Sequence, residues 1–421
     1  MDPLLPVILL SLILGAIISF LIFGNYFRKQ KSEVESLAKG EPVNDAISKK
    51  PSKPTASKKS QFKHHSHASD KEQNKKHHPL DLNTLKGHGD SVGGLSFSSD
   101  GKNLVTAGNH PTAVAFLEDD SSIVVATQNL LGSSIYMYAE EHAKPSSESK
   151  QQAKLPLPEI KWEHHKIHDK NAILNIFGAN ARYGSADGST VIASCSEEIL
   201  TPPQCMFSAT EIKLWHGKSG KLLGTVDTNQ LKNHMASLSP NGRFMAAAAF
   251  TADVKIWEII YSKDGFVKEV NKAMQLKGHK SAVTCLCFTA NSDQIITASK
   301  DGTLKVWNIN VRYHMDEDPK ILRGFPIPLH DSKGATLHYV HLSLSPDGKI
   351  LAATHGSTLQ WLCSETGKVL DIAENAHDGD ITWITWAPKA LPVGNSKSFI
   401  LGSSGVDKKV KLWLAPFISS S

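Results

Sequence analysis

Hydrophobic and polar residues follow three successive patterns along the chain. The first is an uncharged apolar run from Leu4 to Phe23, and the second, from about Lys31 to Pro79, contains few large apolar residues. From about residue 80 onward, short apolar or alternating stretches are separated by turn-forming residues. Stretches of about four to eight such residues are typical of β-strands, so the third pattern predicts an all-β domain.

The third pattern repeats itself, and its clearest unit covers residues 276–308. Three apolar stretches occur in this unit, at residues 282–288, 295–299 and 303–308. Asp301-Gly302 supplies a tight turn before the last stretch, because Asp and Gly favour such turns. We therefore expect three consecutive antiparallel strands here.

This unit resembles the WD repeat. In that family, a His, a hydroxyl residue, an Asp and a Trp form a hydrogen-bonded tetrad, and the resemblance assigns these roles to His279, Ser299, Asp301 and Trp307. The chemistry is consistent, because a carboxylate orients an imidazole and an indole N–H only donates. The role that the resemblance implies for these residues is structural rather than catalytic.

Six more degenerate copies align with this unit, which makes seven in all. The resemblance therefore implies an all-β fold, a seven-bladed WD-repeat β-propeller whose blades close into a ring without a long exposed edge. It also implies that residues 82–86 pair beside residues 410–413 and fasten the two ends of the domain.

The first copy breaks off after Gly108. Where a complete copy would continue with an Asp turn and a strand ending in Trp, His110-Pro111-Thr112 runs directly into the next copy. Judged by the spacing in the clearest unit, about 25 to 30 residues are missing. We expect an incomplete first blade and a lower stability than that of a chain with the segment restored, because an absent strand pair leaves backbone groups unpaired.

The apolar run near the N-terminus predicts a transmembrane helix that precedes the propeller. About twenty residues at about 1.5 Å each span the hydrocarbon core of a bilayer. Basic residues follow the run rather than precede it, which favours an uncleaved anchor over a signal peptide and a cytosolic propeller. The predicted segments are an anchor (1–27), a disordered linker (28–80), the propeller (81–416) and a tail (417–421).

The linker is rich in Lys, Ser and His, and its low hydrophobicity predicts disorder. Its lysines include Lys49, Lys50, Lys58, Lys59, Lys75 and Lys76. Two interpretations stay open. The lysines attract anionic lipid headgroups or RNA, or the segment is a solvated spacer.

Composition adds little chemistry to this picture. The net charge of +5 on 421 residues excludes a strongly basic protein, and the five cysteines include no CxxC pair. No N-x-[ST] glycosylation site occurs, so we expect reduced thiols on the cytosolic side. Phosphate-loop, serine-hydrolase and HExxH zinc motifs are also missing from the sequence. We therefore expect no enzyme, cofactor, metal or small-molecule substrate, but a scaffold that binds proteins through its loops.

Residues 225–312 resemble the transducin beta-like branch of the WD-repeat family. That resemblance implies a single-pass endoplasmic reticulum membrane protein with a cytosolic propeller, acting in stress signalling or translation control. Two alternatives stay open: a guanine-nucleotide exchange factor for a vesicle-coat small GTPase, and RNA or ribosome binding through the basic linker. The candidate interaction surface is Asn229, Gln230 and His234, with simple turn chemistry as the other interpretation of this region.

Overall fold

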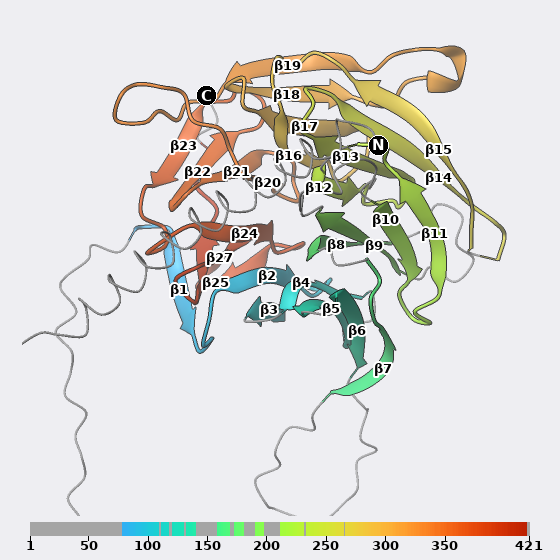
Figure 1. The fold of residues 1–421 in the computed structure, drawn as a ribbon. Coiled ribbons are helices and arrows are strands. Elements are labelled where there is room, and N and C mark those ends of the chain that lie inside the picture. The colour runs from blue at the N-terminus through green and yellow to red at the C-terminus, as the bar shows by residue number, and fades with distance from the viewer. Residues whose placement is uncertain are drawn as a thin grey trace, which may run out of the picture. The chain divides into compact units, whose positions relative to one another are not determined.

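The computed structural model describes residues 78–108, 111–117, 120–129, 132–139, 158–168, 172–180, 190–197, 211–230, 233–264 and 266–418. The chain divides into two compact units, residues 1–73 and 74–421. The first unit lies outside the described residues, and so do the six linker lysines named above. The second unit holds a ring of antiparallel sheets (Figure 1).

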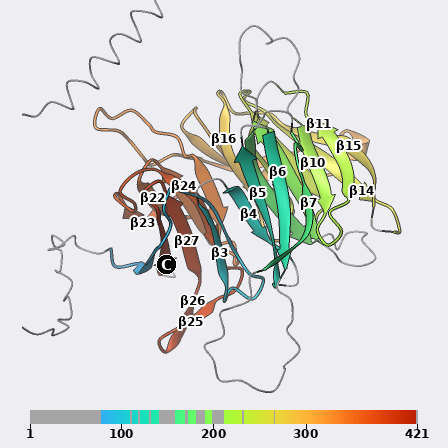
Figure 2. The ribbon, with the colours of Figure 1, turned by 60° about the horizontal axis from the view of Figure 1, so that its bottom comes forward.

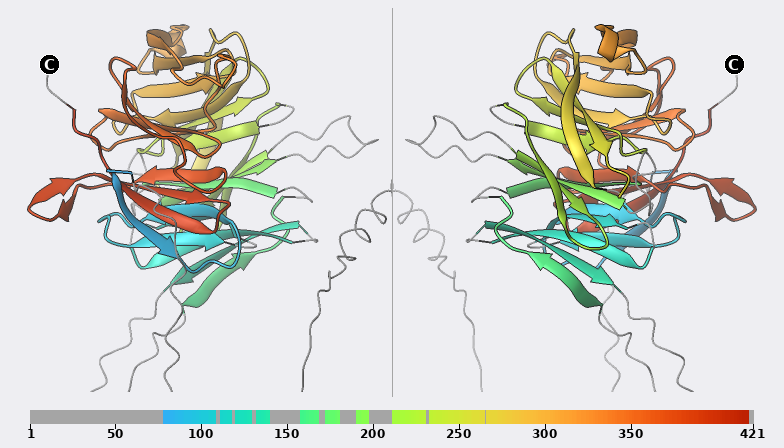
Figure 3. Two further views of the ribbon diagram at one scale, coloured as in Figure 1. Left: turned by 90° about the vertical axis from the view of Figure 1, so that its left-hand side faces the viewer. Right: turned by 90° about the vertical axis from the view of Figure 1, so that its right-hand side faces the viewer.

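Six of these sheets have four strands each. From the ring's centre outward they are β4 (Pro111–Phe116), β5 (Ser122–Asn129), β6 (Gly132–Ala139) and β7 (Glu159–His164); β8 (Ala172–Asn180), β9 (Thr190–Glu197), β10 (Glu211–His216) and β11 (Leu222–Asp227); β12 (Asn233–Leu238), β13 (Phe244–Ala249), β14 (Val254–Tyr261) and β15 (Val267–Leu276); β16 (Val283–Phe288), β17 (Gln294–Ser299), β18 (Thr303–Asn308) and β19 (Lys320–Pro326); β20 (His341–Leu344), β21 (Ile350–His355), β22 (Thr358–Cys363) and β23 (Val369–Ala373); and β24 (Ile381–Trp386), β27 (Ile400–Gly405), β28 (Lys409–Leu414) and β1 (Asp81–Lys86). Figure 3 shows these blades from two sides of the ring.

The prediction of an all-β propeller is confirmed, but seven complete blades are not found. Between β24 and β4 the described part of the ring contains only β2 (Val92–Phe97) and β3 (Leu104–Gly108), which form a two-stranded sheet. Their residues belong to the first sequence copy, which stops at Gly108 because the chain then enters β4 directly. The ring of described residues therefore consists of six four-stranded blades and the β2–β3 strand pair, and a second two-stranded sheet, β25–β26, is inserted in the last blade between β24 and β27.

The core lies between neighbouring blades. In one layer, Phe244 and Ile256 of one blade pack with Val283 and Leu286 of the next. Every residue of β13 is buried, and four of its six residues are alanines, so small side chains let the blades approach closely. The short apolar stretches in the sequence are therefore strands whose side chains are buried between two blades rather than against a single core.

The two ends of the domain meet in the last blade, as predicted. Strand β1 pairs antiparallel with β28, and Leu85 lies opposite Val410. Just before β1, the ring of His78 stacks on Trp361 of the neighbouring blade, with centroids 5.9 Å apart. Chain closure therefore rests on backbone pairing and on packing across two blades.

One prediction needs correction. Among the described residues, no helix is long and apolar enough to cross a membrane, and their only helical segment is the 3₁₀ turn η1 (Tyr313–Met315). The predicted localisation, a single-pass protein of the endoplasmic reticulum membrane with a cytosolic propeller, is contradicted by this finding. The run predicted as the anchor, residues 1–27, lies outside the described residues.

Candidate interaction face and the tetrads beneath it

The clearest side-chain network lies in the β16–β19 blade. The Nδ1 atom of His279 is 3.0 Å from Asp301 Oδ2, and its Nε2 atom is 2.8 Å from Thr297 Oγ1. The Trp307 indole N–H donates to the same Thr297 oxygen at 2.8 Å. All three hydrogen bonds are shielded from water, because His279 is 7 % exposed, Thr297 0 % and Trp307 1 %. They tie the loop before β16 to the second and third strands of the blade.

The hydroxyl of this tetrad comes from Thr297 and not from Ser299, the residue assigned from the sequence. Trp307 lies opposite Ile295, and its indole reaches along β17 to Thr297. Ser299 stands at the end of β17, where its hydroxyl donates to the Ser281 carbonyl and accepts from the Asp301 backbone N–H. Ser299 therefore stabilises the turn rather than the His–Trp connection.

Protonation in this tetrad follows from burial. Burial lowers the pKa of His279 below its ordinary value, and the hydrogen bond to Asp301 opposes this only in part. Burial would raise the pKa of Asp301, but hydrogen bonds from Thr303, the Lys280 backbone and His279 outweigh it and lower this pKa to about 2. At neutral pH a neutral imidazole donates to the Asp301 carboxylate and accepts from the Thr297 hydroxyl.

A second complete tetrad, which the sequence analysis missed, joins β24, β27 and β28. His377 contacts Asp407 at 2.9 Å and Ser403 at 2.8 Å, and the Trp413 indole N–H donates to Ser403 at 2.8 Å. The signal that identifies it is the spacing from the hydroxyl residue to Asp and then to Trp, which matches that of the first tetrad. The spacing from His377 is longer, because the hairpin of β25 (Leu391–Val393) and β26 (Ser396–Ser398) is inserted between β24 and β27.

Other blades carry parts of the same arrangement. In the β8–β11 blade, Ser194 accepts from the Trp215 indole N–H and contacts His168, each at 3.1 Å. In the β20–β23 blade, Thr354 Oγ1 and Trp361 Nε1 are buried without a hydrogen-bond partner among the described residues. Burial without a partner costs free energy, so this blade gains less from its polar groups than the two with complete tetrads.

The strand pair β2–β3 carries half a tetrad. His88 Nε2 lies 2.7 Å from Thr106 Oγ1, and the 18-residue separation equals that of His279 and Thr297. A Cβ atom on Gly108 would lie 2.5 Å from His88 Nδ1, much as one on Gly405 would lie 2.6 Å from His377 Nδ1. The imidazole of His88 thus has the same placement as in the complete tetrad of His377.

The tetrads fix one face of the ring, which we call the loop face. It consists of the loops that enter the inner strands and the loops between the second and third strands of each blade. Three apolar residues on these loops are well exposed: Phe250 (56 %), Val340 (42 %) and Val406 (45 %). Exposed apolar side chains held on rigid loops are typical of protein-binding surfaces.

The surface residues predicted from the sequence occupy one loop of this face and the strand after it. Asn229 is exposed with a positive φ of 46°, and its backbone N–H donates to Asp227 Oδ1 at 2.8 Å. Lys255 Nζ donates to the carbonyls of Thr228 and Asn229, each at 3.1 Å. Gln230 is buried, so it presents no contact surface, and His234 lies in β12 with its side chain outside the described residues.

A cavity of about 150 Å³ lies among the inner strands β2, β4, β8 and β24. Thr112 Oγ1 and Asn175 Nδ2, from residues that line it, are buried without a hydrogen-bond partner among the described residues. Sites for drug-sized ligands usually measure about 300–1,000 Å³, so this cavity suits a few solvent molecules better than such a ligand.

Other chemistry is sparse in the described part of the chain. No group of three or more His, Cys, Asp or Glu side chains there could hold a metal ion. Cys195 and Cys285 are buried and form no disulfide, and burial raises the pKa of both thiols, that of Cys195 to about 12. Such thiols are protonated at neutral pH and unreactive.

The comparisons with known proteins agree with the fold. The family model described as "WD domain, G-beta repeat" matches residues 81–125 and 271–308. The chain therefore carries WD repeats, and the tetrads and the ring define it as a WD-repeat β-propeller. It is 36 % identical to Transducin beta-like protein 2 of Homo sapiens over 186 residues, which are 44 % of this chain and 40 % of that protein.

Two further relatives extend this result. Transducin beta-like protein 2 of Mus musculus is 28 % identical over 336 residues, which are 73 % of this chain and 68 % of that protein. Ribosome biogenesis protein YTM1 of Chaetomium thermophilum is 25 % identical over 175 residues, 40 % of this chain and 34 % of that protein. The resemblance to the transducin beta-like branch, predicted from residues 225–312, is thus confirmed, although the chain spans less than half of the human relative in that alignment.

Proposed function

We propose that this WD-repeat scaffold binds its protein partners through the loop face. The observation that carries the proposal is the exposure of Phe250, Val340 and Val406 on loops of one face. Asn229, exposed on the same face, is the one residue of the predicted surface that we retain as a contact. A propeller of this kind is generally a non-enzymatic scaffold, and we propose that this chain has no catalytic activity of its own.

Quantitative affinity capture tests this proposal. A triple variant (Phe250→Ser, Val340→Ser, Val406→Ser) is compared with the unaltered chain, both carrying the same tag. The matched control places two serines on the opposite face, at Phe266 (40 % exposed) and Met315 (72 % exposed). We expect the loop-face variant to lose partners that the control retains. Equal capture by all three proteins would refute the loop face as the binding surface.

We further propose stress signalling or translation control as the process that the scaffold serves. The support is the resemblance to the transducin beta-like branch, together with a relative whose name assigns that protein to ribosome biogenesis. Co-sedimentation with ribosomes, measured with and without the loop-face substitutions, tests this role. If the same amount of the chain sediments with and without ribosomes, and with and without the substitutions, the proposed role is contradicted.

The second candidate is RNA or ribosome binding through the lysines of the linker, whose proposed bounds are residues 28–80. It is favoured by the clustering of Lys49, Lys50, Lys58, Lys59, Lys75 and Lys76 in the sequence. Binding of this kind weakens steeply with salt and is lost when the six lysines become glutamine. A nucleotide-release assay on vesicle-coat GTPases separates both candidates from an exchange factor, an activity that no feature of the described residues favours.

A further inference from the structure

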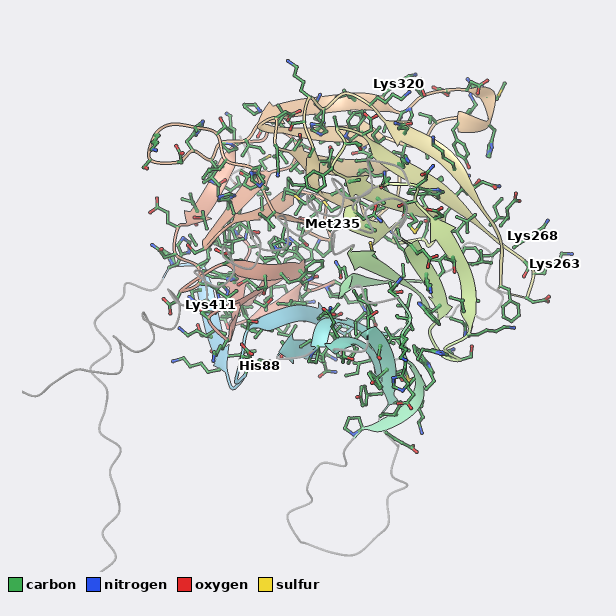
Figure 4. All side chains as sticks on the ribbon, in the orientation of Figure 1. His88, Met235, Lys263, Lys268, Lys320 and Lys411 are labelled. Carbon is green, nitrogen blue, oxygen red and sulfur yellow. The ribbon has the colours of Figure 1, made fainter. Side chains whose placement is uncertain are left out.

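The outer edge of β3 differs from the corresponding edge of the complete blades. Among the described residues, β3 pairs with β2 alone, whereas β17 and β27 each pair with strands on both sides. Four of the five residues of β3 are partly exposed, while five of six in β17 and all six in β27 are buried. Figure 2 shows β3 beside β4 of the next blade, and Figure 4 shows His88 at the lower margin of the ring.

The sequence of β3 closely resembles that of β17, the strand that pairs with the Trp-bearing third strand of its blade. Leu-Val-Thr-Ala at 104–107 aligns with Ile-Ile-Thr-Ala at 295–298 in β17. Thr106 takes the place of Thr297, but it is partly exposed where Thr297 is fully buried. The His and Thr of a tetrad are thus present and positioned, while no third strand among the described residues pairs with β3 to bring Asp and Trp.

The complete blades show what that neighbouring strand carries. In four blades the third strand has Lys two residues before Trp, at Lys213, Lys255, Lys305 and Lys411. Lys305 lies opposite Thr297 and donates to the Gly278 carbonyl just before His279, at 2.6 Å. Lys213 donates in the same way to the carbonyl before His168, at 2.5 Å.

We propose that β3 is an open docking edge for an extended segment of a partner protein in which Lys stands two residues before Trp, flanked by apolar residues. The segment adds as an antiparallel third strand, so that its Trp lies opposite Leu104 and its Lys opposite Thr106. The indole N–H donates to the Thr106 hydroxyl, and the Lys ammonium donates to the Gly87 carbonyl. Backbone pairing supplies affinity, and these two side chains supply selectivity.

A peptide with the sequence of residues 301–308, DGTLKVWN, is the probe, because this sequence already fills the same position beside β17. Its binding to the full chain is measured by fluorescence anisotropy with a labelled peptide. We expect saturable one-to-one binding that weakens at least tenfold when the peptide Trp is replaced by Ala. The Thr106→Val substitution should weaken binding of the Trp peptide about tenfold and leave binding of the Ala peptide unchanged. The Thr354→Val substitution, in a blade that already has its third strand, should change the binding of neither peptide.

Several results would overturn the proposal. The first is the absence of saturable binding, and the second is equal binding of the Trp and Ala peptides. The third is a dimer, detected by light scattering, that dissociates when the peptide binds, because a second copy of the chain would then cover β3. If Thr106→Val does not fold, the comparison of the two peptides on the unaltered chain still decides. The proposal rests on the scaffold function but uses a different surface. If the peptide does not bind but the loop-face variant still loses partners, only the proposed docking at β3 is refuted. If the peptide binds but the loop-face variant keeps its partners, only the loop face is refuted.

Discussion

Replacing Thr297 by Val removes one hydroxyl from the middle of a buried network and leaves the shape of the side chain nearly unchanged. Two groups then lose their partner, the indole N–H of Trp307 and Nε2 of His279, each 2.8 Å from the Thr297 oxygen. A buried polar group without a partner costs about 1–3 kcal/mol, so the two together cost about 2–6 kcal/mol. Burial of the added methyl group stabilises the folded chain by about 1 kcal/mol. We expect the free energy of unfolding to fall by about 3 kcal/mol, a large part of the roughly 5–15 kcal/mol typical of a domain.

The chain offers a matched control at the corresponding position of the β20–β23 blade. Thr354 is as deeply buried as Thr297, at 1 % against 0 % exposed, but its hydroxyl has no hydrogen-bond partner among the described residues. Thr354→Val should therefore be neutral or stabilising. Urea unfolding followed by circular dichroism measures both variants. Equal losses in the two, or no loss at Thr297, would refute the claim that the tetrad and not the packing stabilises the blade.

Three further predictions follow from other contacts. Burial lowers the pKa of His279 and of His377, so the unfolded chain binds more protons near pH 6 than the folded chain does. The thermal midpoint should therefore fall as the pH drops through 6.5, and a constant or rising midpoint would contradict this. Gly405→Ala would place a Cβ 2.6 Å from His377 Nδ1 and should cost about 1–3 kcal/mol in urea unfolding, whereas Gly324→Ala, whose nearest such neighbour is 3.9 Å away, should cost much less. A chain that begins at residue 87 lacks β1 and leaves β28 unpaired on one side, so it should unfold at lower urea than one that begins at residue 78; equal midpoints would show that β1 does not fasten the ring.

The sequence was sufficient to predict the propeller, because each strand is short, buried between two blades and bounded by turn residues. It also located the break after Gly108 and the pairing of residues 82–86 with the last strand. It misplaced the tetrad hydroxyl at Ser299, because Ser and Thr alternate on one face of β17 and only the reach of the Trp307 indole distinguishes them. The tetrad of His377 was missed because the inserted hairpin lengthens the spacing on its His side.

The loop face was harder to predict for a different reason. Asn229 and Gln230 are adjacent in sequence, yet the turn exposes one and buries the other, since Lys255 holds the carbonyls of this loop. Phe250, Val340 and Val406 come from three different blades, so no local pattern connects them. Their grouping on one face results from ring closure, which no single repeat contains.

Hydrogen exchange of the full chain, read by mass spectrometry, tests the central claim most directly. The claim is a ring of six complete blades and one strand pair with an open edge. Peptides that cover 294–299 and 400–405 should stay protected for hours, because both strands are paired on two sides, whereas the peptide that covers 104–108 should exchange much faster. Equal protection of all three segments would mean that another strand covers β3, and it would contradict the account.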